Sequence, residues 1–244
     1  MRILPIACDA NAFSLACVAA GETILIDAGF SPQQWQRAES LHDVRAHQVN
    51  HLLITHEHED HLRGLSWWLQ EMAVKTIRIW GSAELQPYLK LPGALRDRFT
   101  PIPAGGTFSL GDFRVQAIPV IHDAIAPLAY QLHHGRCTGL IATDCGRVTQ
   151  LMKKALGESN QAFLSPYYAD SMLPDPNQSD AARRVASLHG HLSNQALADW
   201  LRESGGRLER LLLGHRHPQW NNRAKIMSDL LPVLGEKVVV ELHG

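Results

Sequence analysis

The chain has 244 residues, of which 45% are hydrophobic and 19% charged, and its formal net charge is −1 at pH 7. These values are ordinary for a soluble enzyme, and no apolar run approaches the roughly 20 residues of a membrane helix. The near-neutral charge also argues against binding of nucleic acid through a broad basic surface, so a polyanionic substrate would need a local positive site.

No repeat, low-complexity tract or linker-like stretch divides the sequence, which predicts one domain over residues 1–244. The first residues break at Pro5 and lack the apolar core and cleavage site of a secretory signal. The cysteines form no CxxC pair, which argues against a disulfide framework or a zinc ribbon; they are Cys8, Cys17, Cys137 and Cys145. We therefore expect reduced, mostly buried cysteines and a cytoplasmic protein.

The amino-terminal part predicts a hairpin, a helix and then a buried strand. Phe13 to Ala19 and Thr23 to Asp27 are expected to pair as strands around a turn at 20–22, and Ser31-Pro32 opens a helix. The apolar run His51 to Thr55 is followed at once by a group of His and acidic residues. This order places the group on a loop at the carboxyl end of a strand.

The rest of the chain predicts further strands and helices in a mixed order. A helix is expected from His61 to about Ala73, a strand from Thr76 to Trp80, and a short helix capped by Ser82. Four strands should then form a meander: Phe108 to Leu110, Phe113 to Val120, Leu128 to His133 and Thr138 to Thr143. Helices at 148–156 and 194–203 alternate with strands at 162–165, 208–213 and 237–242. This order predicts an α/β (α+β) fold, an αββα sandwich of two mixed β-sheets with helices on the outer faces.

The densest group of metal-binding residue types is the run His56-Glu57-His58-Glu59-Asp60-His61. Packing three imidazoles and a carboxylate together would cost free energy unless a cation neutralised them. His56 and His58 can reach one ion from the same side, while Asp60 and His61 turn toward a second position about 3.5 to 4 Å away. A solvated charged loop is the alternative, but the buried strand before the run favours a metal site.

Thr55 to His61 matches every defined position of the pattern T-H-x-H-x-D-H, and the chain thereby resembles the metallo-β-lactamase superfamily. The resemblance implies a two-metal centre with further ligands after later strands. His122 would complete the first metal site, His215 would complete the second, and Asp144 would bridge both. It also implies that Asp27, in Leu25-Ile26-Asp27-Ala28-Gly29, orients ligands without touching the metal.

Within that superfamily the sequence is similar to the single-domain YycJ/WalJ-like group, which is related to ribonuclease Z. Gly190-His191-Leu192-Ser193-Asn194-Gln195-Ala196 resembles the group's G-H-L-S-N-x-x-A motif, and Trp220-Asn221-Asn222 resembles the end of its closing motif. The resemblance implies that His191 contacts the scissile phosphate and that His191 and Asp60 act in catalysis. The alternative is that His191 only caps the helix that begins near Ser193.

The chain departs from that group at three places. Leu164-Ser165-Pro166-Tyr167-Tyr168-Ala169 stands where the group has L-E-S-N-H-D, so an acidic partner for His191 is missing. Asp9-Ala10-Asn11-Ala12 replaces a G-S-S-G-N loop, and Arg216-His217 replaces Leu-Ser. The two tyrosines fit either stacking on a base or ordinary packing, and Arg216-His217 fits either phosphate binding or a solvated strand end.

These features predict a metal-dependent hydrolase, in the first place a phosphodiesterase that acts on nucleic acid or a small cyclic phosphodiester. Two divalent ions are expected, zinc first with manganese or iron as alternatives, and they would lower the pKa of a shared water to yield the attacking hydroxide. Hydrolysis of thioesters or lactones stays open, because those enzymes share the same ligands. An iron-dependent oxidoreductase is less favoured, since the flavodiiron pattern has Glu where His58 stands. We expect no membrane partner, and the oligomeric state is left open.

Overall fold

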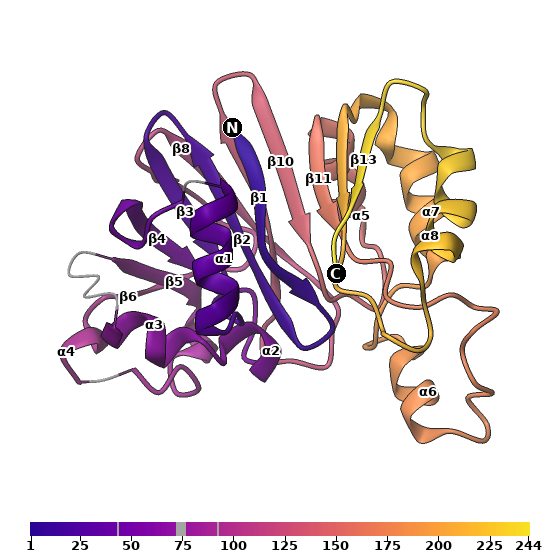
Figure 1. Cartoon of the computed structure of the whole chain (residues 1–244), viewed down its shortest axis with the longest axis horizontal. Coiled ribbons are helices and arrows are strands. Elements are labelled where there is room, and N and C mark those ends of the chain that lie inside the picture. Colours follow the sequence, from indigo (N-terminus) through magenta and orange to yellow (C-terminus); the bar gives the residue numbers. More distant parts are fainter. Residues whose placement is uncertain (43, 72–76, 92) are drawn as a thin grey trace.

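The computed structural model describes residues 1–42, 44–71, 77–91 and 93–244. Within these ranges the strands form two sheets that pack against each other (Figure 1). The six-stranded sheet has the spatial order β1 (Arg2–Asp9), β2 (Ala12–Ala19), β3 (Glu22–Ile26), β4 (Val49–Leu53), β5 (Arg78–Ser82) and β6 (Phe99–Ile102). The seven-stranded sheet has the order β13 (Val239–Leu242), β12 (Arg210–Leu213), β11 (Gln161–Leu164), β10 (Cys137–Ala142), β9 (Leu128–His134), β8 (Phe113–Pro119) and β7 (Thr107–Leu110).

Helices cover the outer face of each sheet. Residues of α1 (Pro32–His42) and α3 (Leu65–Glu71) pack on the first sheet, and those of α5 (Gln150–Glu158), α7 (Asn194–Ser204) and α8 (Arg223–Leu230) on the second (Figure 1). The shorter helical segments are α2 (Glu59–Leu62), α4 (Gly93–Arg96), α6 (Asp180–Val185), η1 (Ala46–Gln48), η2 (Ala83–Leu85), η3 (Gly205–Arg207) and η4 (Leu231–Val233). Among the helices of the described ranges, none has both the length and the apolar character needed to cross a bilayer.

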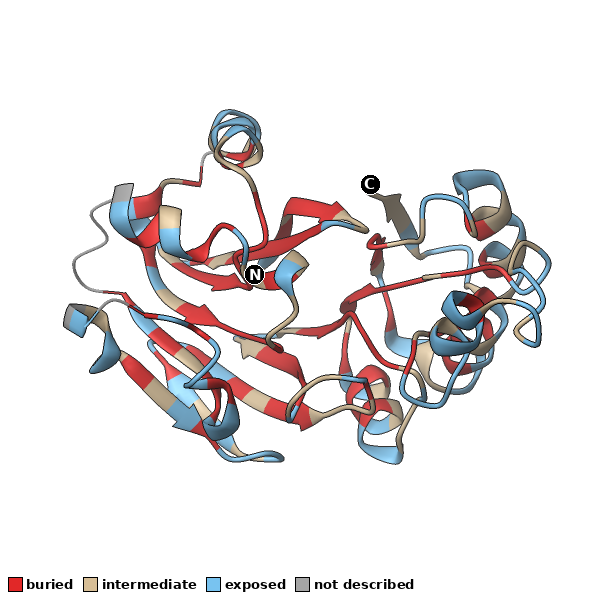
Figure 2. Cartoon of the chain, turned by 90° about the horizontal axis from the view of Figure 1, so that it is seen from below, coloured by how far each residue is buried: buried red, intermediate tan, exposed pale blue. Residues whose placement is uncertain are grey.

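Three apolar clusters separate these four layers. The middle cluster combines side chains of both sheets, such as Leu15 and Ile24 from the first and Tyr130 and Leu212 from the second. Figure 2 shows the buried strands in the interior and the exposed residues on the outer helices. Both sheets contain parallel and antiparallel pairs. The predicted αββα sandwich of two mixed sheets is therefore confirmed.

Local sequence signals explain several of these elements. Ala20 and Gly21 join β2 to β3 with φ of 49° and 83°, the positive values that a two-residue type I′ turn requires. At the start of α1, the Ser31 hydroxyl accepts from the Gln34 backbone N–H, and the Gln34 side-chain oxygen accepts from the Ser31 backbone N–H. This reciprocal pair is a capping box. The predicted hairpin, first helix and meander of β7 to β10 are confirmed.

Other predictions were wrong or incomplete. Edge strands β1 and β6 were not predicted, because each contains a proline, Pro5 or Pro101, which is compatible with an edge position but weakens a strand pattern. The single helix expected from His61 is two helices, α2 and α3, and residues 73 and 76 lie outside the described residues. Ser82 does precede η2, but its hydroxyl makes no capping hydrogen bond.

Candidate metal centre

The carboxyl end of β4 begins the site. His56 and His58 lie on the loop after this strand, as predicted, whereas Asp60 and His61 lie in the first turn of α2 rather than on the loop. β4 runs parallel to its neighbours β3 and β5, and side chains beyond the carboxyl ends of parallel strands gather at one edge of the sheet. The helical turn places the His61 ring beside the His56 ring, with centroids 4.1 Å apart.

Asp27 ties this loop to the end of β3. Its buried carboxylate accepts hydrogen bonds from the Thr55 hydroxyl at 2.6 Å, the Thr55 backbone N–H at 2.7 Å and His61 Nδ1 at 2.7 Å. Asp27 has a φ of 55°, a conformation that costs a non-glycine residue free energy and is often found at functional sites. Gly29 lets α2 approach, because a Cβ at this residue would lie 1.6 Å from the Asp60 carbonyl oxygen. The predicted orienting role of Asp27 agrees with these contacts.

The other predicted ligands come from the second sheet and converge on the same place. His122 follows β8, Asp144 follows β10, and His215 follows β12 with a φ of 57°. Asp144 is central, because its carboxylate oxygens lie 2.8 Å from His61 Nε2, 3.3 Å from His215 Nε2 and 3.8 Å from His56 Nε2. We refer to the seven predicted ligands as the ligand cluster: His56, His58, Asp60, His61, His122, Asp144 and His215.

Each histidine of the ligand cluster uses one ring nitrogen to bond an acceptor outside it. The acceptors are the Thr55 hydroxyl for His56 (2.9 Å), the Asp123 carbonyl for His58 (3.3 Å), the Asp27 carboxylate for His61 (2.7 Å), the Gly190 carbonyl for His122 (2.9 Å) and the Asp9 carbonyl for His215 (2.8 Å). These bonds assign the proton to the outer nitrogen and leave the other with a free lone pair. Histidines that bind metals are oriented in this way.

Several inward-facing atoms lack hydrogen-bond partners within the part of the chain that the structure describes. They are His56 Nε2, His61 Nε2 and both carboxylate oxygens of Asp144, and all are buried. These atoms approach one another closely without making aligned hydrogen bonds. Buried polar atoms left in this state are costly, and a cation between them would remove the cost. The fold and the donor set together imply divalent metal binding.

The electrostatics of the site also favour positive charge at its centre. Burial and the nearby His61 hold the pKa of His56 well below its usual value. Burial would lower the pKa of His61 as well, but the carboxylates of Asp27 and Asp144 reverse this shift and raise it well above the usual value. Burial would raise the pKa of Asp144, but His215 and the other adjacent histidines hold it well below the usual range. Asp144 is therefore a carboxylate that a cation can bind.

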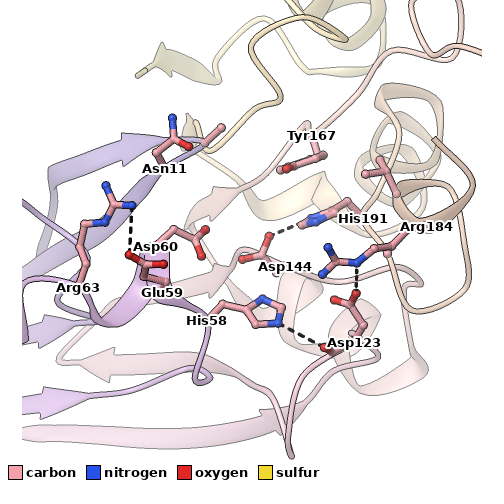
Figure 3. Close-up of a pocket in the computed structure, with 13 residues that line it drawn as sticks. Asn11, His58, Glu59, Asp60, Arg63, Asp123, Asp144, Tyr167, Arg184 and His191 are labelled. Atoms are coloured by element: carbon pink, nitrogen blue, oxygen red, sulfur yellow. Dashed lines mark hydrogen bonds and ion pairs between the residues drawn. The ribbon is translucent and has the colours of Figure 1, made fainter. Parts of the chain in front are cut away.

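His191 faces this cluster and does not cap α7. The cap is the Ser193 hydroxyl, which accepts from the Ala196 N–H at 3.2 Å, while His191 Nδ1 lies 2.9 Å from Asp144 Oδ1. The Tyr167 ring stacks on the His191 ring with centroids 3.6 Å apart and an interplanar angle of 8° (Figure 3). Ser165, at the position of the missing acid, donates to the His215 carbonyl at 2.7 Å. Tyr167 thus positions His191 by stacking, whereas Tyr168 is buried and its packing interpretation is favoured.

A cavity of about 360 Å³ lies over the ligand cluster, lined by His58, Asp60, Asp144, Tyr167 and His191 among others. Arg63 and Arg184 stand on opposite sides of it (Figure 3). Arg184 pairs with Asp123 (Nε to Oδ2, 2.5 Å) and Arg63 lies 3.9 Å from Glu59. Sequence reasoning missed these two arginines. Arg63 directly follows α2, so helical spacing from Glu59 and Asp60 could have indicated that it lies beside the site. The long segment before Arg184 has no sequence pattern that indicates a site.

Comparison with known proteins gives a consistent result. The chain matches the beta-lactamase superfamily domain over residues 22–215. It is 26% identical over 198 residues to the exodeoxyribonuclease WalJ of Streptococcus pneumoniae serotype 2, covering 79% of this chain and 72% of that protein. Among solved structures, the fold is similar to the metallo-beta-lactamase fold protein YhfI from Bacillus subtilis (TM-score 0.77, 15% identity, 99% and 96% of the two chains). It is also similar to the short form of human tRNase Z (TM-score 0.68, 19% identity, 88% and 93%).

Proposed function

The chain belongs to the beta-lactamase superfamily, and we propose that it is a metal-dependent phosphodiesterase that acts on nucleic acid. The observation that carries this proposal is the position of His191, whose imidazole faces the shared Asp144 carboxylate from the side of the cavity. The sequence relationship to an exodeoxyribonuclease supports the same substrate class. Arg63 and Arg184 line the cavity, each beside an acid, and would donate to the oxygens of a phosphate group, while bound cations would supply most of the positive charge.

We propose that the ligand cluster holds two zinc ions. His56, His58 and His122 would hold one, and Asp60, His61 and His215 would hold the other, since the ligand atoms within each triad lie within 4.8 Å of one another. Asp144 would contact both. Five imidazoles and two carboxylates are a donor set that suits zinc better than magnesium or calcium.

Bound divalent ions would lower the pKa of a water molecule toward about 7 and offset the charge of the phosphoryl group. Asp60, whose side chain lies at the cavity and is 25% exposed, would accept a proton from the attacking water. His191 would donate to a phosphoryl oxygen or protonate the leaving oxygen. Tyr167 would keep the His191 ring in place, and Thr55 and Asp27 would keep His56 and His61 oriented.

The proposal is tested with zinc-loaded protein on bis(p-nitrophenyl) phosphate, a thioester and a lactone. We expect hydrolysis of the phosphodiester that falls by roughly 100- to 10,000-fold in the His191→Ala variant, with unchanged zinc content. His189→Ala is the matched control, because His189 is an exposed histidine two residues away and outside the cavity lining. Activity confined to the thioester or lactone and indifferent to His191→Ala would contradict the proposal and favour hydrolysis of carbonyl compounds.

We further propose that residues 1–244 act as one domain in the cytoplasm. All four cysteines are free and three of them are buried, which agrees with the expectation of reduced thiols.

A further inference from the structure

Aromatic rings form a row that leads away from Asp144. His191 stacks on Tyr167, and the Tyr167 ring lies 5.8 Å from the His217 ring in an edge-on arrangement. His217 in turn stacks on Trp220, with centroids 3.9 Å apart and an interplanar angle of 11°. The row therefore joins the cavity over the ligand cluster to the segment after β12.

Backbone hydrogen bonds hold the outer rings against the segment that carries Tyr167. The His217 N–H donates to the Tyr167 carbonyl at 2.8 Å, and the Ala169 N–H donates to the Trp220 carbonyl at 2.8 Å. His217 Nδ1 accepts from the backbone N–H groups of Gln219 at 3.3 Å and Trp220 at 3.1 Å. The His217 ring is thus fixed as the tautomer that is protonated at Nε2. A platform that is already rigid loses little conformational entropy when a ligand binds.

Core packing does not explain why His217 and Trp220 stack on each other. Trp35, Trp68 and Trp200 are fully buried, whereas His217 and Trp220 are both half-buried. Within the described part of the chain, neither His217 nor Trp220 belongs to any of the three apolar clusters. A rigid, partly exposed aromatic pair next to an active-site cavity needs another explanation.

We propose that His217 and Trp220, here called the outer platform, stack against an unpaired base of single-stranded nucleic acid whose scissile phosphate lies at the ligand cluster. This inference rests on the proposed function and names the substrate as single-stranded. Aromatic rings stack on any base, at roughly 1 to 3 kcal/mol per base. With a net charge of −1 the chain has no overall positive excess, so base stacking would add to the contacts that Arg63, Arg184 and bound cations make with phosphate groups.

The test compares a substrate without bases with substrates that contain them. The kcat/KM of zinc-loaded protein is measured on bis(p-nitrophenyl) phosphate and on oligothymidylates of increasing length, for the wild type, Trp220→Leu, Trp220→Phe and Tyr88→Leu. Trp220→Leu should lower the ratio of oligonucleotide to small-substrate kcat/KM by about 5- to 150-fold. Trp220→Phe should restore most of the ratio, because it keeps an aromatic face. Tyr88 is an exposed aromatic outside the cavity lining and serves as the matched control.

A Trp220→Leu ratio equal to that of the wild type, or an equal fall in Tyr88→Leu, would overturn the outer platform. The second measurement is binding of a fluorescein-labelled phosphorothioate octathymidylate, followed by anisotropy, which needs no turnover. If no phosphodiester is cleaved at all, the proposed function fails, and binding still decides the platform. Weaker binding in Trp220→Leu alone supports it, whereas equal binding by all variants rejects it. Thermal melting confirms that each variant is folded.

Discussion

The ligand cluster and the wall of the cavity above it are built in opposite ways. In the cluster every histidine is fixed by a bond to an outer acceptor, and the residues come from the loops after β4, β8, β10 and β12 and from the first turn of α2. The wall, by which we mean Tyr167 and Arg184, is more exposed: Tyr167 is half-buried and the Arg184 side chain is 68% exposed. The cluster keeps the family pattern, whereas the tyrosines beside it depart from the related group. We infer that the cluster and His191 set the chemistry, whereas the wall sets the substrate.

The strongest test of these separate roles of the ligand cluster and the wall is Asp144→Asn. The Asp144 carboxylate lies within 3.3 Å of His61, His191 and His215, and an amide cannot offer two anionic oxygens to the cluster. We expect zinc content to fall and activity on every substrate to drop by more than about 1,000-fold. Metal analysis and the phosphodiester assay measure both. Asp112→Asn, at an exposed acid in the turn before β8, is the control. Full zinc content in Asp144→Asn would contradict the proposal that the ligand cluster holds the zinc through Asp144.

Addition of zinc should stabilise the protein, because the cluster joins loops of both sheets and buries unpartnered polar atoms. At a free zinc concentration about 1,000 times the Kd, binding contributes about 4 kcal/mol to the free energy of unfolding. For a chain of this size that corresponds to a rise in Tm of about 8 to 16 °C. Differential scanning fluorimetry measures the shift, which should be smaller in Asp144→Asn. An unchanged Tm would mean that the cluster does not bind zinc.

A smaller effect is expected at the residues that orient the cluster. Asp27→Asn replaces the carboxylate that accepts from His61 Nδ1, and Thr55→Val removes the hydroxyl between Asp27 and His56. Either change should lower zinc affinity by about 10- to 100-fold, measured by competition with a chromophoric chelator. Thr55→Ser keeps the hydroxyl and should bind zinc as the wild type does. Equal affinities for Val and Ser at this position would show that the hydroxyl has no orienting role.

The ligand cluster could be predicted from the sequence more completely than the wall. Four of the seven cluster residues lie within positions 56–61, after β4. The other three follow β8, β10 and β12, which are strands that the sequence pattern predicts. The strands β1 and β6 escaped prediction because Pro5 and Pro101 interrupt their patterns. The wall was harder, since stacking of Tyr167 on His191 and the approach of Arg184 to the cavity depend on tertiary packing of α6. Gly146 shows this dependence: a Cβ there would lie 2.3 Å from the Leu188 carbonyl oxygen, a close approach between segments far apart in the sequence.

The mildest change should be Arg184→Gln, which tests the wall alone. Arg184 lines the cavity and is held by Asp123, while the adjacent Arg183 pairs with Asp180 at 2.8 Å and lies outside the cavity lining. Arg184→Gln should reduce kcat/KM on phosphodiesters by about tenfold, because an exposed arginine contributes one screened, charge-assisted contact to a phosphate. Zinc content should not change. Arg183→Gln removes the same charge from the same helix and should leave kcat/KM at the wild-type value. Equal losses in the two variants would mean that Arg184 acts only through overall charge, and the wall would then have no specific phosphate contact on α6.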